Sequence, residues 1–370
     1  MIDYRNHTEA IIDLDAYARN LSFFQNHCAP SKIMPIVKAD GYGHGALPLS
    51  LLVQKMGFPF FGVAFFEEAL ELLNGGISTP VLVMNYTRPD CIPFAQEKKI
   101  RITLYAFEQW ERIRPYLNPE PLFVHVKVDT GMSRLGQSPE ETDRFLRLLL
   151  QEKGVRIEGI FTHYATADQP ENPFQKKQYD RFSELFEEWR DKIPFIHMDN
   201  SAAGFHRRTP LGDLVRCGIA SYGLDPSNEK RGSDLQPVLS WHSLISFVKD
   251  IKPGTPVSYG NTFISNRTMR AATVPIGYAD GYNRLLSNNS QVLVDGQRCS
   301  VIGRVCMDQI IIDVSHIPQA KMGDPVVLIG KMGQDEISAE EIAQKIRTIN
   351  YEVTCSISKR VPRVYKEKAE

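Results

Sequence analysis

The chain has 370 residues, of which 42% are hydrophobic and 24% charged, a composition that supports a globular protein with a sizeable core. This length favours two domains over one. The formal net charge of −1 argues against nucleic acid or an anionic membrane as a partner, although a local pocket could still take a small anionic ligand.

The remaining bulk features indicate a cytoplasmic protein. No apolar run reaches membrane-spanning length, and the first residues, MIDYRNHTEA, lack the apolar segment of a signal peptide. The six cysteines show no CxxC pair and no close Cys/His spacing, so we expect reduced thiols and no metal site. They are Cys28, Cys91, Cys217, Cys299, Cys306 and Cys355.

Short apolar runs rich in Val, Ile and Phe recur over the first 223 residues. They lie at 33–38, 60–65, 80–85, 100–105, 122–128, 157–164, 195–200 and 215–223. Stretches with helical spacing, such as ETDRFLRLLLQEKG and QKKQYDRFSELFEEWRDK, separate them. Eight such repeats predict an α/β fold, a (β/α)8 TIM-type barrel over residues 10–235, with an open doubly wound sheet as the alternative.

After Leu235 the pattern changes to strand-like runs broken by Gly, Pro and Asp-Gly turn signals. One short helix is expected at SAEEIAQKIRT, where Ser338 and Glu341 have the spacing of a capping box. Residues 236–370, together with 1–9, are therefore predicted to form a mostly β second domain.

Charged and polar residues stand at the carboxyl ends of the predicted strands, where a barrel builds its active site. They are Lys38, Lys127 with Asp129, His163, and Asn200 with Ser201. Arg216 is the exception, because it lies at the start of its run.

Lys38 ends an apolar run in the segment PIVKADGYGHG and is followed by glycines at 41, 43 and 45. A lysine there either caps a strand and reaches solvent or acts as a Schiff-base amine, which requires a lowered pKa. The glycines indicate a tightly bent backbone or a close approach to a ligand.

The segment PIVKADGYGHG resembles the pyridoxal phosphate attachment segment of the fold-type III alanine racemases. The resemblance continues in family order through HVKVDTGMSRLG, GIFTHYATAD, DNSAA, VRCGIASYG, PVSYGNTF, PIGYADGY and IGRVCMDQ. It covers nearly the whole chain and implies a racemase that interconverts L- and D-alanine and supplies D-alanine for peptidoglycan.

The resemblance assigns the cofactor contacts. Lys38 would hold pyridoxal phosphate as an internal aldimine, and the hydroxyls of Tyr42 and Ser201 would bind its phosphate. The backbone N–H groups of Gly218 and Ile219 would complete the phosphate site.

Inverting a stereocentre suits two bases on opposite faces of a planar intermediate. The resemblance assigns these roles to Lys38 and Tyr259, with His163 and Arg216 as cationic neighbours that favour a phenolate. It also implies that Arg216 faces the pyridine nitrogen. Taken singly, Tyr259 suits a half-buried packing residue, His163 a core histidine and Arg216 a surface ion pair.

The implied substrate-binding groups are Arg134 and the N–H of Met307, which would hold the carboxylate. Lys127 matches a position that carries a carbamate in some family members, and a solvated lysine is the alternative. Cys306 and Asp308 would line the entrance.

Because Tyr259 and Met307 lie in the second domain, the resemblance implies a homodimer in which each β domain completes the partner's active site. One departure is Lys359, where family members carry a tyrosine near the phosphate; the lysine would either pair with phosphate or leave the site. The alternatives are a serine or broader-specificity racemase, an amino-acid decarboxylase on the same architecture, and a non-enzymatic cofactor carrier.

Overall fold

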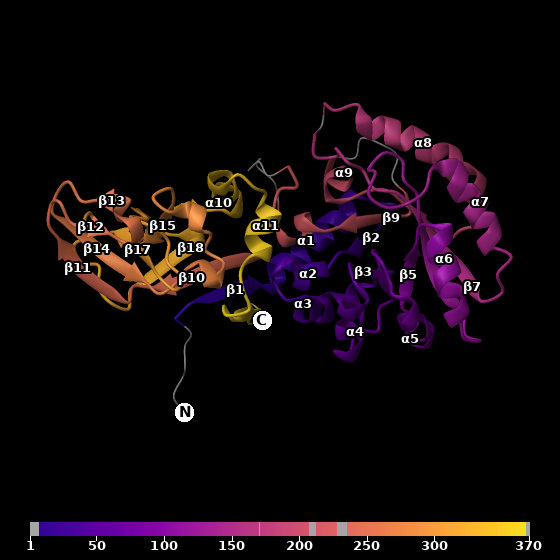
Figure 1. The fold of residues 1–370 in the computed structure, drawn as a ribbon, viewed down its shortest axis with the longest axis horizontal. Helices are drawn as coiled ribbons and strands as arrows, with labels where there is room; N and C mark the ends of the chain where they lie inside the picture. Colours follow the sequence, from indigo (N-terminus) through magenta and orange to yellow (C-terminus); the bar gives the residue numbers. More distant parts are fainter. Residues whose placement is uncertain (1–6, 170, 207–211, 228–234, 368–370) are drawn as a thin grey trace. The chain divides into compact units, whose positions relative to one another are not determined.

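The computed structural model describes residues 7–169, 171–206, 212–227 and 235–367 (Figure 1). The chain divides into two compact units. The first, which we call the barrel unit, comprises Tyr17–Gly41 and Gly45–Ser221. The second, the β unit, comprises Met1–Ala16, Tyr42–His44 and Tyr222–Glu370.

The described part of the barrel unit contains eight parallel strands, one at each predicted run. They are β2 (Lys32–Pro35), β3 (Phe61–Val63), β4 (Val81–Val83), β5 (Arg101–Leu104), β6 (Leu122–Lys127), β7 (Val155–Phe161), β8 (Phe195–His197) and β9 (Leu214–Cys217). Strands β3 to β8 pair in sequence order, and β2 pairs with β9.

Two further backbone links close the ring of strands. A parallel bridge joins Ile36, just after β2, to Gly62 of β3. The Asp213 N–H, just before β9, donates to the Ile196 carbonyl of β8 over 2.7 Å. The predicted (β/α)8 barrel is therefore confirmed, and the open sheet is wrong.

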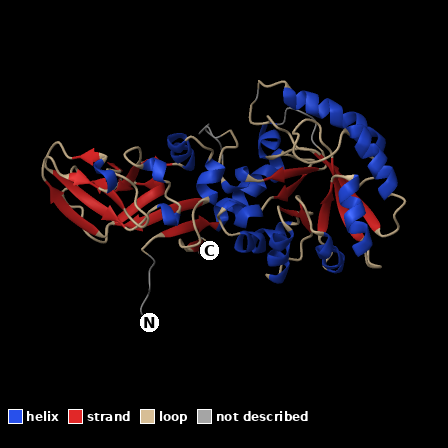
Figure 2. Cartoon of the chain, in the orientation of Figure 1, coloured by secondary structure: helices blue, strands red, loops and turns tan. Residues whose placement is uncertain are grey.

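Helices lie outside these strands and cover them, as Figures 1 and 2 show. They are α1 (Leu14–His27), α3 (Ala46–Val53), α4 (Phe66–Asn74), α5 (Ile92–Glu97), α6 (Phe107–Ile113), α7 (Pro139–Leu149), α8 (Phe174–Trp189) and α9 (Ser201–His206). The segment labelled α2 (Lys38–Tyr42) is a left-handed turn after β2 rather than a regular helix. Helix α7 shows how the sequence specifies such a helix. Ser138 caps its N-terminus by accepting from the Glu141 N–H (3.2 Å), and Phe145 and Leu149 are buried on its inner side.

The β unit is mostly β, as predicted. Its strands are β1 (Glu9–Asp13), β10 (Leu239–Leu244), β11 (Phe247–Ile251), β12 (Pro256–Val257), β13 (Phe263–Ile264), β14 (Met269–Val274), β15 (Gln291–Val294), β16 (Gln297–Ser300), β17 (Ile310–Asp313), β18 (Pro325–Met332), β19 (Asp335–Ile337) and β20 (Arg363–Lys366). The main sheet has the order β16-β15-β18-β10-β1-β20, with β19 on β18, and a second sheet has the order β11-β14-β17.

The described part of the β unit also contains the helices α10 (Ala339–Ile346) and α11 (Asn350–Cys355). The predicted cap of α10 is present, since the Ser338 hydroxyl accepts from the Glu341 N–H over 3.2 Å. The reciprocal half of the capping box is not: the Glu341 carboxylate instead accepts two hydrogen bonds from Arg298, at 2.9 and 3.1 Å. A bidentate guanidinium partner outcompetes the single backbone N–H of Ser338 for that carboxylate.

None of the helices in the described ranges has the length and apolar character of a transmembrane segment. The same residues contain no group of three His, Cys, Asp or Glu side chains able to hold a metal ion.

Candidate active site

The barrel gathers the predicted residues at one rim, beyond the carboxyl ends of its strands. Lys38 follows β2, Lys127 is the last residue of β6, and His163 follows β7. Ser201 follows β8 as the first residue of α9. Arg216 is no exception after all: β9 ends at Cys217, whereas the predicted run continues to residue 223, so Arg216 also lies next to a carboxyl end.

Lys38 begins a turn with left-handed backbone geometry. The φ angles are 52° at Ala39, 51° at Asp40, 60° at Gly41 and 54° at Tyr42. Left-handed geometry costs roughly 1–2 kcal/mol for each residue with a Cβ, and only Gly41 escapes that cost. The glycines therefore explain only part of this turn.

Two carboxylates hold the strained turn. Asp40 accepts from the Ala46 N–H over 2.8 Å. Glu68, in the first turn of α4, accepts from the Ala39 N–H (2.6 Å) through one oxygen and from the Ala64 N–H (2.7 Å) through the other. Strain maintained in this way marks a functional position, here the backbone that carries Lys38. Sequence reasoning missed Glu68, whose only signal is its place in the helix that follows β3.

Arg216 is buried, so it is not a surface ion pair. Its Nη1 contacts Nδ1 of His197 at 2.9 Å. Its Nη2 donates to the carbonyls of Met198 (2.8 Å) and Thr162 (2.9 Å) and lies 3.2 Å from Nδ1 of His163. Burial lowers the pKa of Arg216 to about 10, which leaves it protonated at neutral pH. These contacts hold the guanidinium in one orientation.

The guanidinium determines the protonation of its histidine neighbours. Arginine has donors and no acceptor, so Nδ1 of His163 and Nδ1 of His197 must both accept. Each ring is then neutral and carries its hydrogen on Nε2. His163 can therefore donate a hydrogen bond only through Nε2.

The rim is rich in positive charge. Burial lowers the pKa of His163 well below its ordinary value, and nearby cations lower it further: Arg216, Arg134, Lys127 and Lys38. Arg216, Arg134 and Lys38, with the fraction of Lys127 that stays protonated, make the surroundings of this neutral imidazole positive, which favours the binding of anions because each anion relieves their mutual repulsion.

Lys127 is 6% exposed, so it is not a solvated surface lysine. Its Nζ donates to the Val128 carbonyl over 2.6 Å and lies 5.6 Å from the centre of the Phe161 ring. Burial, and then the charge of Arg216, lowers its pKa to about 7. An amine with that pKa is substantially neutral, and hence nucleophilic, at neutral pH.

Ser201 and Gly218 meet at the ends of β8 and β9. The Gly218 N–H donates to the Ser201 hydroxyl oxygen over 2.8 Å, and the Ala220 N–H approaches the same oxygen at 3.4 Å. Ile219, which begins a 3₁₀ turn, is buried beside them. Ser201 thus keeps an O–H that it can donate.

The β unit presents a second set of predicted residues. Tyr259 is 69% exposed and Met307 52% exposed, so Tyr259 is not a half-buried packing residue. Their two loops are joined through Ser258, which donates to the Arg304 carbonyl over 2.6 Å and lies 3.4 Å from Sγ of Cys306. Tyr259, Cys306 and Met307 therefore share one exposed edge.

The neighbouring predicted residues have structural partners within the β unit. Asp308 accepts from Arg360 over 2.8 Å, beside the exposed Lys359. The ring of Tyr42 is buried, with its centroid 5.0 Å from that of Tyr222 and 6.0 Å from that of Tyr351.

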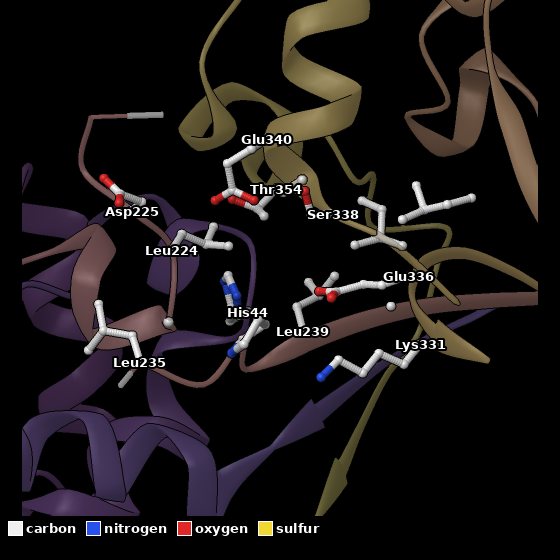
Figure 3. Close-up of a pocket in the computed structure, with 16 residues that line it drawn as sticks. His44, Leu224, Asp225, Leu235, Leu239, Lys331, Glu336, Ser338, Glu340 and Thr354 are labelled. Carbon is white, nitrogen blue, oxygen red and sulfur yellow. The ribbon is translucent and has the colours of Figure 1, made fainter. Parts of the chain in front are cut away.

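The β unit also contains a cavity of about 370 Å³ (Figure 3). The carboxylate of Glu340 lies on its wall and accepts from the Asn350 side chain over 2.8 Å, and Asn350 donates to the Asp225 carbonyl over 2.9 Å. None of the predicted site residues lines this cavity.

The barrel, the β unit and the polar groups gathered at the barrel rim are typical of a two-domain enzyme of the TIM-barrel type. Residues 12–226 match the family model described as "Alanine racemase, N-terminal domain", and residues 238–365 match "Alanine racemase, C-terminal domain". The chain belongs to the alanine racemase family, which places it among the amino-acid racemases, a class of isomerase.

Individual relatives agree. The alanine racemase of Desulfovibrio desulfuricans is 42% identical over 374 residues, covering 99% of this chain and 100% of that protein. The crystal structure of alanine racemase from E. faecalis is 36% identical with a TM-score of 0.92, covering 99% of this chain and 100% of the other. The Bartonella henselae alanine racemase structure, with covalently bound pyridoxal phosphate, is 28% identical with a TM-score of 0.89, covering 98% and 100%.

Proposed function

We propose that this chain is a cytoplasmic, pyridoxal-phosphate-dependent alanine racemase that interconverts L- and D-alanine and supplies D-alanine for peptidoglycan. The observation that carries the proposal is the group of cations around the neutral His163 at the barrel rim. The phosphate of the cofactor and the carboxylate of the amino acid are the two anions that such a rim accommodates.

The donor set fits the cofactor. Lys38 belongs to a turn whose backbone is hydrogen-bonded by Asp40 and Glu68, and the Ser201 hydroxyl can donate a hydrogen bond to a phosphate. When bound, pyridoxal phosphate makes the substrate Cα–H acidic by withdrawing electrons into its ring. Arg216 would face the ring nitrogen; as a permanent cation it cannot share a proton with it, which would restrain side reactions such as transamination.

Racemisation then requires one base on each face of Cα. Lys38 would take or deliver the proton on one face, and the phenol oxygen of Tyr259 on the other. The Nε2–H of His163 is its only donor, so it suits a hydrogen bond to a phenolate oxygen. In this scheme Arg216 holds His163 in that tautomer, and His163 stabilises the charged tyrosine.

Tyr259 would come from a second copy of the chain. Exposures of 69% for Tyr259 and 52% for Met307 suit side chains that a partner subunit covers. Arg134 would bind the substrate carboxylate together with the Met307 N–H, and Cys306 and Asp308 would lie at the entrance. The predicted homodimer with shared sites follows from these roles.

Proton NMR tests the activity directly. Purified protein with pyridoxal phosphate is added to L-alanine in heavy water, and loss of the Cα–H signal is followed alongside chiral analysis. We expect exchange together with the appearance of D-alanine, and slower turnover of L-serine. Cofactor visibly bound, with no exchange of either amino acid, would contradict the proposal and favour a cofactor carrier.

Variants test the two bases. Tyr259→Phe should lower racemisation by roughly 10²- to 10⁴-fold, the contribution of a general acid–base, while the cofactor spectrum stays normal. Lys38→Ala should abolish covalent attachment of the cofactor. Tyr116→Phe, at an exposed tyrosine outside the matched segments, is the control and should remain active. Equal activities of the Tyr259 and Tyr116 variants would remove Tyr259 from the mechanism.

A further inference from the structure

We propose that His125 is a positioning residue: it fixes the tautomer of His197 and, through His197, the orientation of Arg216. The catalytic consequence rests on the proposed function, in which Arg216 faces the cofactor. The tautomer assignment itself does not depend on that function.

The three side chains form a linear hydrogen-bonded chain inside the barrel. Nδ1 of His125 lies 2.9 Å from Nε2 of His197, and Nδ1 of His197 lies 2.9 Å from Nη1 of Arg216. Both histidines are fully buried, and Arg216 is 4% exposed. The ring of Phe161 stacks on that of His197, with centroids 4.7 Å apart and planes 4° apart.

Arginine sets the direction of every bond in this chain. Because Arg216 can only donate, Nδ1 of His197 must accept, which puts the hydrogen of His197 on Nε2. That N–H points at Nδ1 of His125, so His125 must accept and must carry its own hydrogen on Nε2. Nε2 of His125 has no hydrogen-bond partner among the described residues, so the chain ends there.

His125 must be neutral to serve as this acceptor. A protonated ring would bring two N–H donors face to face at 2.9 Å. Burial, with further contributions from Arg101 and Arg216, lowers the pKa of His125 to about 3, consistent with a ring that stays neutral at every physiological pH. Nδ1 of His125 therefore remains a hydrogen-bond acceptor throughout the physiological pH range.

The backbone around His125 is adapted to this position. Strands β6 and β7 shift register here: Val124 pairs with Ile157, whereas His125 pairs with Gly159, so Glu158 is an extra residue. Such a bulge re-aims side chains. A Cβ on Gly159 would lie 2.3 Å from Nδ1 of His125, so glycine is needed for the ring to occupy this place.

Loss of the acceptor on His125 would change the orientation of Arg216. Without Nδ1 of His125, the Nε2–H of His197 would be buried without a partner. If His197 changed tautomer instead, its Nδ1–H would confront the N–H of Arg216. The tautomer change relieves the unpaired donor, so loss of His125 favours it; the guanidinium then loses its contact with His197, and its remaining acceptors, which all contact Nη2, leave more than one orientation open.

The experiment compares two substitutions with the same number and branching of side-chain heavy atoms in the holoenzyme. His125→Asn keeps an acceptor oxygen near the position of Nδ1, and His125→Leu does not. We expect the leucine variant to lower kcat roughly tenfold to a hundredfold, because a small misplacement of Arg216 costs up to about that much in rate, with KM little changed. The asparagine variant should recover most of this loss. Equal kcat values for the two folded variants would overturn the positioning role.

A direct readout does not need activity. In ¹⁵N-histidine-labelled wild-type protein, the long-range ¹H–¹⁵N correlations should place the hydrogen on Nε2 of both His125 and His197, and His125→Leu should broaden or move the His197 signal. A hydrogen on Nδ1 of either wild-type ring would overturn the assignment even if the leucine variant does not fold. A wild-type enzyme that racemises nothing but shows both Nε2–H signals would refute the proposed function and leave the assignment standing.

Discussion

Asp199 offers a sharp test of buried charge at the rim. It is fully buried, and no side chain among the described residues donates a hydrogen bond to its carboxylate. Burial raises its pKa from 3.8 to about 7, although the charge of Arg216 and the backbone N–H of Gly212 act in the opposite direction. Asn has nearly the same shape and cannot ionise, so Asp199→Asn removes the charge while keeping the packing.

The sign of the pH effect follows from the two pKa values. Below pH 3.8 the folded and unfolded chains both hold the proton, so Asp199 has no effect on stability. Between 3.8 and about 7 only the folded chain retains it, so the unfolding free energy falls as the pH rises. Above about pH 7 the carboxyl group is ionised in both states, and the unfolding free energy is lowered by the full cost of burying the charge. At 1.36 kcal/mol for each pH unit between the two values, that penalty is at most about 4 kcal/mol.

Thermal unfolding of both proteins from pH 4 to pH 8.5 measures this difference. Near pH 4 the wild type and Asp199→Asn should melt together, and above pH 7 the variant should melt several degrees higher. Asp191→Asn, at an exposed carboxylate, is the matched control and should follow the wild type throughout. A difference that does not change with pH, or a variant less stable at pH 8, would refute the reasoning.

Two further predictions concern other buried polar groups. Asn350→Ala removes a donor to the carboxylate of Glu340 and should destabilise the protein by about 1–3 kcal/mol, seen as a lower melting temperature; an unchanged melting temperature would contradict it. Lys127, with a pKa of about 7, should react as a neutral amine with dissolved CO₂. With ¹³C-bicarbonate we expect a carbamate carbonyl signal that weakens below pH 7 and is absent from Lys127→Met; identical spectra of the two proteins would exclude the carbamate.

The order and position of the barrel strands were predictable from sequence because parallel strands are buried on both faces and read as continuous apolar runs. The residues at which the strands end were harder to predict. The run containing Arg216 was placed at 215–223, whereas β9 spans Leu214–Cys217 and gives way to a 3₁₀ turn. An apolar turn that follows an apolar strand extends the same run of apolar residues, so the sequence does not show where the strand ends. The motif residues around Lys38 and Ser201 were likewise visible, because they are contiguous in the chain.

The local elements, the glycine-rich turn and the candidate rim residues could be predicted from the sequence, because each depends on neighbours in the chain. The protonation of the site could not, because it depends on residues that the fold brings together. The neutral rings of His125 and His197 depend on hydrogen bonds across 72 residues and on a guanidinium 19 residues beyond His197. Tautomers and pKa values are set by burial and by charges nearby in space, and no periodicity in the chain records which side chains those will be.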